Sequence, residues 1–261
     1  FLRSAPHETS VTAQRGEATA PGDWPVDGLH HRADYFKPYL AHASIGPSCA
    51  LAHWDGARLT VWTHSQGIQN LRDDLVLALA REARPVAKDA ITIHHVEGAG
   101  CYGHNGADDV AFDAVLMALA CPGQPVRVCW TRADELTHSP CGSAHLVELQ
   151  ARLDADGRIT HWHEAIRANG YSSRPGRART PTLLAASERA DATPLPLAIN
   201  PPAANGGGAD RNAVPAYAIP NLQVFNHRLT VMPLRTSAMR ALGAYANVFA
   251  IESFIDELAR A

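Results

Sequence analysis

Apolar residues recur along the chain at two spacings, and each spacing predicts one kind of element. Apolar positions three and four residues apart predict helices that begin near Ile68, Ala107 and Ala244. The last helix is expected to bury one face, made of Ala244, Val248, Ile251, Ile255 and Leu258. The middle helix, over residues 107–120, is apolar in most directions and should therefore be largely buried.

Short apolar runs bounded by turn residues predict strands. Residues 47–63 contain two such runs joined by Asp55-Gly56, a pair that suits a two-residue hairpin turn. A longer hairpin is predicted over residues 145–169, turning at Asp156-Gly157. Single strands are predicted at residues 91–97, 124–132 and 222–232. The pattern indicates an α+β fold of β-hairpins and a mixed sheet packed against three principal helices.

Two segments lack this periodicity. Residues 1–38 contain proline and glycine at irregular intervals, which predicts a linker before a body over residues 39–261. Residues 171–215 are rich in proline and glycine and predict a long loop with little regular structure. Loops of this length are usually functional or mobile.

Composition narrows the classes of protein. The chain has 261 residues, 46% of them hydrophobic, and a net charge of −3, so it has no basic surface for nucleic acid and no apolar run that could span a membrane. Its five cysteines form no Cys-x-x-Cys pair, which favours a reducing, cytoplasmic compartment and leaves the periplasm open. The chain begins at Phe1 without an initiator methionine and is expected to be a fragment of a longer protein.

A glycine-rich turn lies between the strand at 91–97 and the helix at 107–120. Gly98, Gly100 and Gly103 permit positive φ angles and let a ligand approach the main chain closely. Such a turn suits a phosphate-bearing or oxo-bearing group. Asp108 and Asp109 at the helix start oppose an anion on the helix axis, so the group is expected beside the helix end.

The same glycines satisfy the dinucleotide-binding pattern Gly-x-Gly-x-x-Gly, which makes an NAD(P)-dependent dehydrogenase one alternative. Against it, the preceding strand ends in His94, His95, Val96 and Glu97 rather than in apolar residues. A turn that is glycine-rich only for packing is a second alternative. His161 and His163 share a strand face, but no third metal ligand follows at a definable spacing, so no metal site is predicted from side chains.

A polar step, Thr63-His64-Ser65-Gln66, follows the first hairpin and precedes a helix. Ligands often bind at the carboxyl ends of strands in layered α/β structures. This position makes Gln66 a candidate binding residue. The alternative is that Ser65 only caps the helix and Gln66 is solvated.

Three segments, in order, resemble one family. They are HASIGPSCALAHWDGARLTVWTHSQGIQNLR, GAGCYGHNGADDVAFDA followed by GQPVRVCWTRADE, and MRALGAYANVFAIESFIDELA. The resemblance is to the molybdenum-binding large subunit of the xanthine dehydrogenase, or molybdenum hydroxylase, family. The run ANGYSSRPG is similar to its nicotinate dehydrogenase and isoquinoline 1-oxidoreductase branch in particular.

The resemblance implies site residues by position. Gln66 matches the glutamine beside the metal and its pterin. Gly100, Cys101, Tyr102 and Gly103 match the family turn Gly-Gly-Phe-Gly, whose main chain faces the metal centre. Arg240 matches the arginine of the turn Phe-Arg-Gly-x-Gly at the same centre. Molybdenum is then expected to be held through the pterin and not by protein side chains.

The resemblance also implies an activity and partners. The family hydroxylates an N-heteroaromatic ring or an aldehyde with water as the oxygen source, using molybdopterin, here in a cytosine dinucleotide form. Iron–sulfur clusters are expected on a small separate subunit, with a cytochrome or flavin subunit as a further partner. No catalytic residue is expected within this chain, because the family's glutamate base would lie beyond Ala261, and the fragment alone is expected to be inactive.

One departure from the family pattern narrows the expected class of substrate. Gly106 stands about where purine-acting members carry a glutamate that binds substrate, which makes purines poor candidates. The remaining alternative is a non-catalytic truncated subunit that only binds partners.

Overall fold

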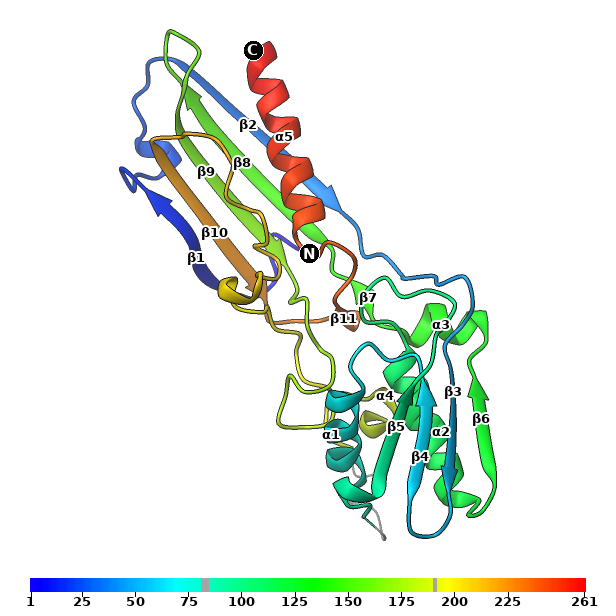
Figure 1. Cartoon of the computed structure of the whole chain (residues 1–261). Helices are drawn as coiled ribbons and strands as arrows, with labels where there is room; N and C mark the ends of the chain where they lie inside the picture. The colour runs from blue at the N-terminus through cyan, green and yellow to red at the C-terminus, as the bar shows by residue number, and fades with distance from the viewer. Residues whose placement is uncertain (81–84, 190–191) are drawn as a thin grey trace.

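The computed structural model describes residues 1–80, 85–189 and 192–261. Figure 1 shows two β-sheets, each with helices packed against it, arranged as two lobes. A two-stranded parallel ladder lies between them, formed by β7 (Cys141–Gly142) and β11 (Thr236–Ser237). The α+β class with mixed sheets is confirmed.

One lobe contains a four-stranded sheet in the order β5, β4, β3, β6. The bounds of these strands are Ile91–His95, Leu59–Thr63, Cys49–Trp54 and Pro125–Cys129. β4 and β5 are parallel and are connected through α1 (Ile68–Leu79), while β3 pairs antiparallel with β4 and β6. α2 (Ala107–Ala120) lies across β3 and is buried along most of its length, as its all-round apolar sequence predicts.

The predicted helical face of α1 is largely confirmed, since Leu71, Leu75 and Leu79 are fully buried against this sheet while Ile68 is only partly buried. The first hairpin is confirmed as well, but its two-residue turn is wrong. The loop runs over residues 55–58, where Asp55 Oδ1 accepts hydrogen bonds from the amides of Ala57 and Arg58 at 2.8 and 2.7 Å. The aspartate side chain thus stabilises a longer loop than Asp-Gly alone would predict.

The other lobe contains a five-stranded sheet in the order β1, β10, β9, β8, β2. The bounds are His7–Arg15, Asn221–Leu229, Ile159–Ala168, His145–Leu153 and Leu29–Lys37. β8 and β9 form the predicted long hairpin, and β9 and β10 are parallel. The third principal helix, α5 (Ala244–Arg260), packs along one face of this sheet (Figure 1).

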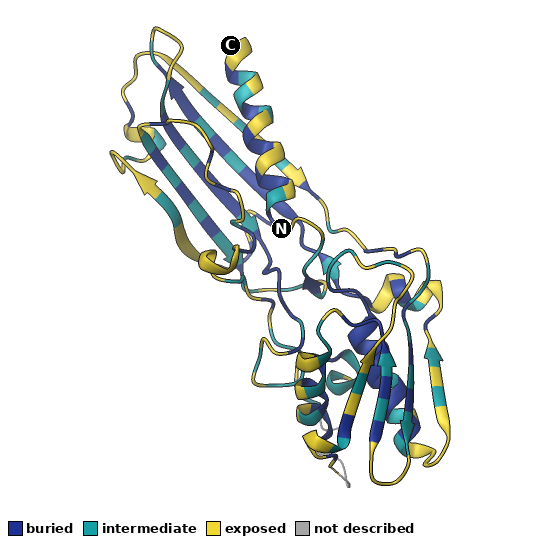
Figure 2. Cartoon of the chain, viewed as in Figure 1, coloured by how far each residue is buried: buried dark blue, intermediate teal, exposed yellow. Residues whose placement is uncertain are grey.

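The expected linker over residues 1–38 is wrong in its secondary structure. Two strands occupy about half of it, and a 3-10 turn, η1 (Pro21–Asp23), lies between them. β1 pairs with β10 and β2 pairs with β8, so both are edge strands of the larger sheet. Figure 2 shows β1 largely exposed, while β2 is buried or half-buried at alternate positions, which are His31, Ala33, Tyr35 and Lys37. Because two of these four residues are His and Lys, neither strand shows a clear apolar alternation in the sequence.

The buried face of α5 differs from the predicted one. Ala250, Ile251, Phe254 and Leu258 are buried, whereas Val248 is 41% exposed. Ile251 and Leu258 belong to the predicted stripe, whereas Ala250 and Phe254, which meets Trp162, lie beside it. A short helix, α3 (Arg132–His138), was missed because its seven residues are too few to show periodicity.

Most of the segment over residues 171–215 is irregular, as its prolines predict. It contains α4 (Leu184–Ser187) and a 3-10 turn, η3 (Ala203–Asn205), and a further 3-10 turn, η2 (Lys88–Ala90), precedes β5. The segment is anchored at both lobes, since Leu183 is buried against α2 and Tyr171 against the larger sheet. Residues 190 and 191 of the predicted loop lie outside the described residues.

Candidate functional site

The polar step after β4 and the glycine turn after β5 leave from the same edge of the four-stranded sheet. Because the two strands are parallel, their carboxyl ends coincide. The Val96 amide donates to the Thr63 carbonyl at 2.9 Å, and His95 Nδ1 lies 3.0 Å from the Ser65 carbonyl oxygen. Gln66 at the end of this step is exposed, so its amide is open to the surface beside the turn.

Gly98 is required by close packing against His64. A Cβ atom on Gly98 would lie 2.6 Å from His64 Cγ, too near for any other residue. Burial lowers the pKa of His64, so its imidazole is neutral at neutral pH. The Cys49 amide donates to His64 Nε2 at 3.4 Å, which leaves the proton on Nδ1. His64 Nδ1 has no hydrogen-bond partner among the residues that the structure describes.

The turn around Arg240 is bonded directly to the glycine turn. The Arg240 amide donates to the Tyr102 carbonyl at 2.6 Å, and the His104 amide donates to the Ala238 carbonyl at 2.8 Å. Gly103 pairs with Met239 in an antiparallel bridge at φ +133°. A Cβ on Gly103 would lie 2.1 Å from the Ala238 carbonyl oxygen, so glycine is needed for this approach. The two predicted turns thus form one unit.

Gly100 lies at the centre of the unit with φ +127°. Its carbonyl accepts from Asn105 Nδ2 at 3.2 Å, which ties the turn to the start of α2. A Cβ at Gly100 would approach Tyr102 Oη to 2.8 Å and Ser44 Cβ to 3.4 Å. Ser44 is buried, and its hydroxyl has no hydrogen-bond partner in the described part of the chain.

A buried polar network lies behind the turn, and sequence reasoning missed it. His104 Nδ1 accepts from Ser237 Oγ at 2.9 Å, and His104 Nε2 lies 3.1 Å from Asp108 Oδ2. Burial lowers the pKa of His104. Burial alone would raise the pKa of Asp108, but the nearby side chains of His104 and Ser65 hold it below its usual value. The neutral His104 imidazole and the Asp108 carboxylate beside it therefore connect three segments: the polar step, the start of α2 and the segment before the Arg240 turn.

Asp109 likewise has a specific partner and is more than a charge at the start of α2. Its carboxylate accepts from Arg235 Nη1 at 2.7 Å and from the Leu184 amide at 2.9 Å, and the side chain is almost fully buried. Since Asp108 and Asp109 are both engaged, neither directs a free negative charge at the glycine turn. The expected conflict between these carboxylates and an anionic ligand is therefore small.

The predicted site residues reach the surface together. Gln66, Cys101 and Arg240 are exposed and Tyr102 is half-buried. Arg240 also borders a cavity of about 360 Å³ that Lys37 and Tyr171 help to line. Burial lowers the pKa of Lys37 to about 8. The main chain at Gly100, which carries no side chain, and the Arg240 cation fit an anionic, oxygen-rich group, as do the Ser44 hydroxyl and His64 Nδ1, which have no hydrogen-bond partner among the described residues.

The alternatives derived from the sequence lack support in this geometry. β5 is an edge strand of a sheet that contains antiparallel pairs, whereas a dinucleotide-binding first strand is central and parallel. Among the described residues no group of three or more His, Cys, Asp or Glu side chains could hold a metal ion. Within the same residues no helix has the length and apolarity needed to cross a bilayer.

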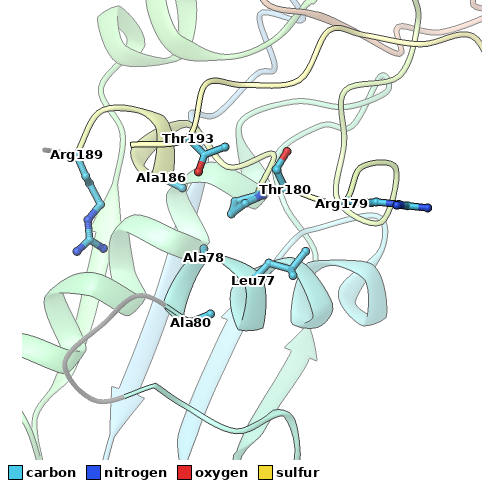
Figure 3. Close-up of a pocket in the computed structure, with 9 residues that line it drawn as sticks. Leu77, Ala78, Ala80, Arg179, Thr180, Ala186, Arg189 and Thr193 are labelled. Atoms are coloured by element: carbon cyan, nitrogen blue, oxygen red, sulfur yellow. The ribbon is translucent and has the colours of Figure 1, made fainter. Parts of the chain in front are cut away.

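A second hollow lies on the outer side of α1 and is separate from the glycine turn. Figure 3 shows Leu77 of α1 and Ala80, which follows α1, on one side of this hollow and Thr180 and Thr193 on the other. None of the predicted site residues lines this hollow. The candidate site is therefore the glycine turn with its two flanking segments.

Fold and site together define a class of protein. Residues 8–190 match the molybdopterin cofactor-binding domain family, so the chain belongs to that family, within the molybdenum hydroxylases. The chain is 40% identical over 226 residues to a subunit of the nicotinate dehydrogenase of Pseudomonas putida, covering 86% of this chain and 17% of that protein. It is 30% identical over 233 residues to the aldehyde oxidoreductase molybdenum-binding subunit PaoC of Escherichia coli K12, covering 87% of this chain and 26% of that protein.

Solved structures share the fold. Quinoline 2-oxidoreductase from Pseudomonas putida 86 superimposes with a TM-score of 0.71 at 16% identity, covering 97% of this chain and 29% of that one. An aldehyde oxidoreductase from Desulfovibrio gigas superimposes with a TM-score of 0.60 at 17% identity, covering 97% of this chain and 25% of that one. The chain thus spans about a quarter or less of the curated relatives that it matches.

Proposed function

We propose that this chain is the molybdenum-cofactor-binding portion of an oxidoreductase that hydroxylates an N-heteroaromatic ring or an aldehyde with water as the oxygen source. The observation that carries the proposal is a main-chain hydrogen bond between the glycine turn and the Arg240 turn, each of which the sequence predicts independently. The Arg240 amide donates to the Tyr102 carbonyl at 2.6 Å, beside the strand end that bears Gln66. Family membership supports the cofactor class.

Each site residue has a role in this proposal. Gly100 and Gly103 keep side chains away from the main chain that would face the cofactor, and Cys101 and Tyr102 lie between them. Gln66 would donate its amide from one side, and Arg240 would supply a positive charge from the other. When bound, the cofactor supplies a Lewis acid and a redox centre, which the protein side chains lack.

One packing constraint and the relatives support the proposed substrate class. A Cβ on Gly106 would lie 2.4 Å from Trp130 Cζ3, so the position where purine-acting members carry a glutamate has no room for a side chain. The two sequence relatives are a nicotinate dehydrogenase and an aldehyde oxidoreductase. Both observations favour a heteroaromatic ring or an aldehyde over a purine.

The remaining parts of the proposal concern the whole protein. We propose the cytosine dinucleotide form of the pterin, and iron–sulfur clusters on a separate small subunit with a cytochrome or flavin subunit as a further partner. The glutamate base would come from a part of the protein outside these 261 residues. Free thiols on all five cysteines fit a reducing compartment, and we place the protein in the cytoplasm.

Elemental and nucleotide analysis of the full-length protein, purified with its co-expressed partner subunits, tests this function. We expect about one molybdenum and one cytidine monophosphate per chain, the latter released by acid hydrolysis. A full-length protein that contains bound nicotinamide nucleotide, or neither molybdenum nor any nucleotide, would contradict the proposal.

A further inference from the structure

Two cysteines face one another on β3 and β6, which are neighbouring strands of the smaller sheet. Cys49 begins β3 and Cys129 ends β6, and the two are direct partners in the antiparallel ladder. The Trp130 amide donates to the Ser48 carbonyl at 3.0 Å, just beyond this pair. That bond marks Cys49 and Cys129 as a non-hydrogen-bonded pair, the closer of the two kinds in an antiparallel ladder.

The spacing of such a pair suits a disulfide. Cα atoms of non-hydrogen-bonded partners lie about 4.5 Å apart, within the window of about 4.4–6.8 Å found for disulfides. Both side chains point to the sheet face away from α2, and the Cys129 thiol donates to the carbonyl of its neighbour Trp130 at 3.7 Å. The other cysteines are Cys101, Cys121 and Cys141, and none of them is a ladder partner of another cysteine.

We propose that Cys49 and Cys129 are a redox-sensitive pair that forms a reversible cross-strand disulfide by exchange with glutathione disulfide. The spacing lies at the short end of the favourable window, and Cys129 is exposed. Exposed disulfides near a geometric limit are the ones that glutathione can both form and reduce. This pair is independent of the proposed molybdenum function.

The exchange proceeds in two balanced steps. The Cys129 thiolate attacks one sulfur of glutathione disulfide, forms a mixed disulfide and releases one glutathione thiolate. Cys49 then loses its proton to solvent and attacks the Cys129 sulfur, which releases the second glutathione. Two thiols are oxidised and one glutathione disulfide is reduced to two glutathiones. Cys49 is the second nucleophile because burial and the neighbouring Cys129 raise the pKa of its thiol.

The Cys49–Cys129 disulfide would hold together the start of β3 and the end of β6, which support the candidate site. The Cys49 amide donates to His64 Nε2 at 3.4 Å, and His64 packs against Gly98 of the glycine turn. Trp130, next to Cys129, packs against Gly106 at the start of α2. Oxidation would therefore join the two sides of the scaffold behind the turn and raise the stability of this lobe.

Peptide mapping after oxidation tests the pair. The 261-residue chain is incubated at low concentration with glutathione disulfide, alkylated and digested with trypsin. We expect a disulfide joining the peptides of residues 33–58 and 128–132. Cys49→Ser should instead hold one stable glutathione on Cys129, and Cys121→Ser, an exposed thiol outside the pair, should oxidise as the parent does.

Thermal unfolding gives a second readout. We expect the oxidised chain to melt several degrees above the reduced chain, with the difference abolished in both Cys49→Ser and Cys129→Ser. Persistent mixed glutathione disulfides on both cysteines of the parent chain would overturn the proposal. Loss of the cross-linked peptides in Cys121→Ser, or equal melting of both forms, would overturn it as well.

Discussion

At the scale of single residues, the turn after Arg240 contains two residues that strain the backbone. Ala241 and Leu242 have φ angles of +68° and +53°, in the left-handed region that favours glycine. Ala241 stands where the family turn Phe-Arg-Gly-x-Gly has a glycine. The turn keeps this conformation because the Arg240 and Leu242 amides both donate to main-chain carbonyls.

Replacing Ala241 by glycine should therefore stabilise the chain. A non-glycine residue in the left-handed region costs about 1–2 kcal/mol, and the added freedom of the unfolded glycine offsets part of the gain. We expect Ala241→Gly to raise the free energy of unfolding by about 0.5–1 kcal/mol, measured by urea denaturation. Ala259→Gly, at the exposed C-terminal end of α5, is the control and should lose less than about 0.5 kcal/mol, because glycine costs little in the last turn of a helix. A loss of stability in Ala241→Gly would show that Ala241 does not strain the backbone.

Gly103 should tolerate no side chain, because two costs combine there. Its φ is +133°, and a Cβ would meet the Ala238 carbonyl at 2.1 Å. Gly123 has a φ of +80°, and a Cβ placed on it would have nothing within 4 Å, so Gly123→Ala measures the dihedral cost alone. We expect Gly103→Ala to lose about 2–3 kcal/mol and Gly123→Ala about 1 kcal/mol in the same denaturation experiment. Equal losses would mean that the glycine turn and the Arg240 turn are not in contact.

At the scale of elements, the start of α2 is held to β11 and α4 by one buried ion pair. Asp109 accepts from Arg235 at 2.7 Å and also from the Leu184 amide. Removing one partner of a buried pair leaves the other charge uncompensated. We expect Asp109→Ala to lose about 3–5 kcal/mol of unfolding free energy. The control is Asp256→Ala, which breaks an exposed pair with Arg260 and should lose less than about 0.5 kcal/mol.

β9 carries a buried carboxyl group with a raised pKa. Glu164 is fully buried, with Trp162 Nε1 donating to Oε2 at 3.3 Å, and burial raises its pKa well above 4.5. The folded state therefore retains a proton that the unfolded chain releases. Its stabilising effect is fully present below pH 4.5 and is lost as the pH rises toward the folded-state pKa.

Glu164→Gln should remove this pH dependence, because the amide stays neutral. We expect the variant and the parent to unfold with similar free energies near pH 4.5. Above that pH the variant should gain about 1.4 kcal/mol over the parent for each pH unit, until the folded-state pKa is reached. Urea denaturation at a series of pH values measures the difference. A difference that does not change between pH 4.5 and 8 would show that Glu164 is not protonated in the folded state.

Helices and strands were predictable from the sequence where one face of the element is buried against a single hydrophobic core. Leu71 and Leu75 of α1 and the two long strands of the hairpin at 145–169 meet such cores, and their patterns are clear. β1 and β2 are edge strands, whose stability comes from ladder bonds to β10 and β8 that leave no apolar pattern. Sequence spacing therefore could not distinguish these strands from a linker.

The candidate site residues could be located in the sequence for a different reason, and their roles in binding stay a prediction. Gln66, Gly100 and Arg240 lie at the junctions between strands and helices, and junctions can be located from periodicity. The network behind them could not be predicted, because His104 and Ser237 are 133 residues apart. Only the spacing of His104 and Asp108, four residues apart, gave a local signal, and it is shared by many solvent-exposed pairs.

At the scale of the whole molecule, the candidate site lies where the two lobes meet. The glycine turn belongs to the smaller lobe, and the Arg240 turn connects β11 to α5 of the larger one (Figure 1). The chain spans only about a quarter or less of the length of its curated relatives. The central claim is that this junction binds the molybdenum cofactor.

The most direct test is the molybdenum content of the full-length protein carrying Gly100→Val. A β-branched side chain at φ +127° resists the backbone conformation and fills the space between Tyr102 and Ser44. Gly123→Val, at a positive φ in open space, controls for backbone strain. We expect Gly100→Val to remain folded by circular dichroism but to contain less than about a tenth of the parent's molybdenum, while Gly123→Val keeps it. Parental molybdenum content in a folded Gly100→Val protein would contradict the account.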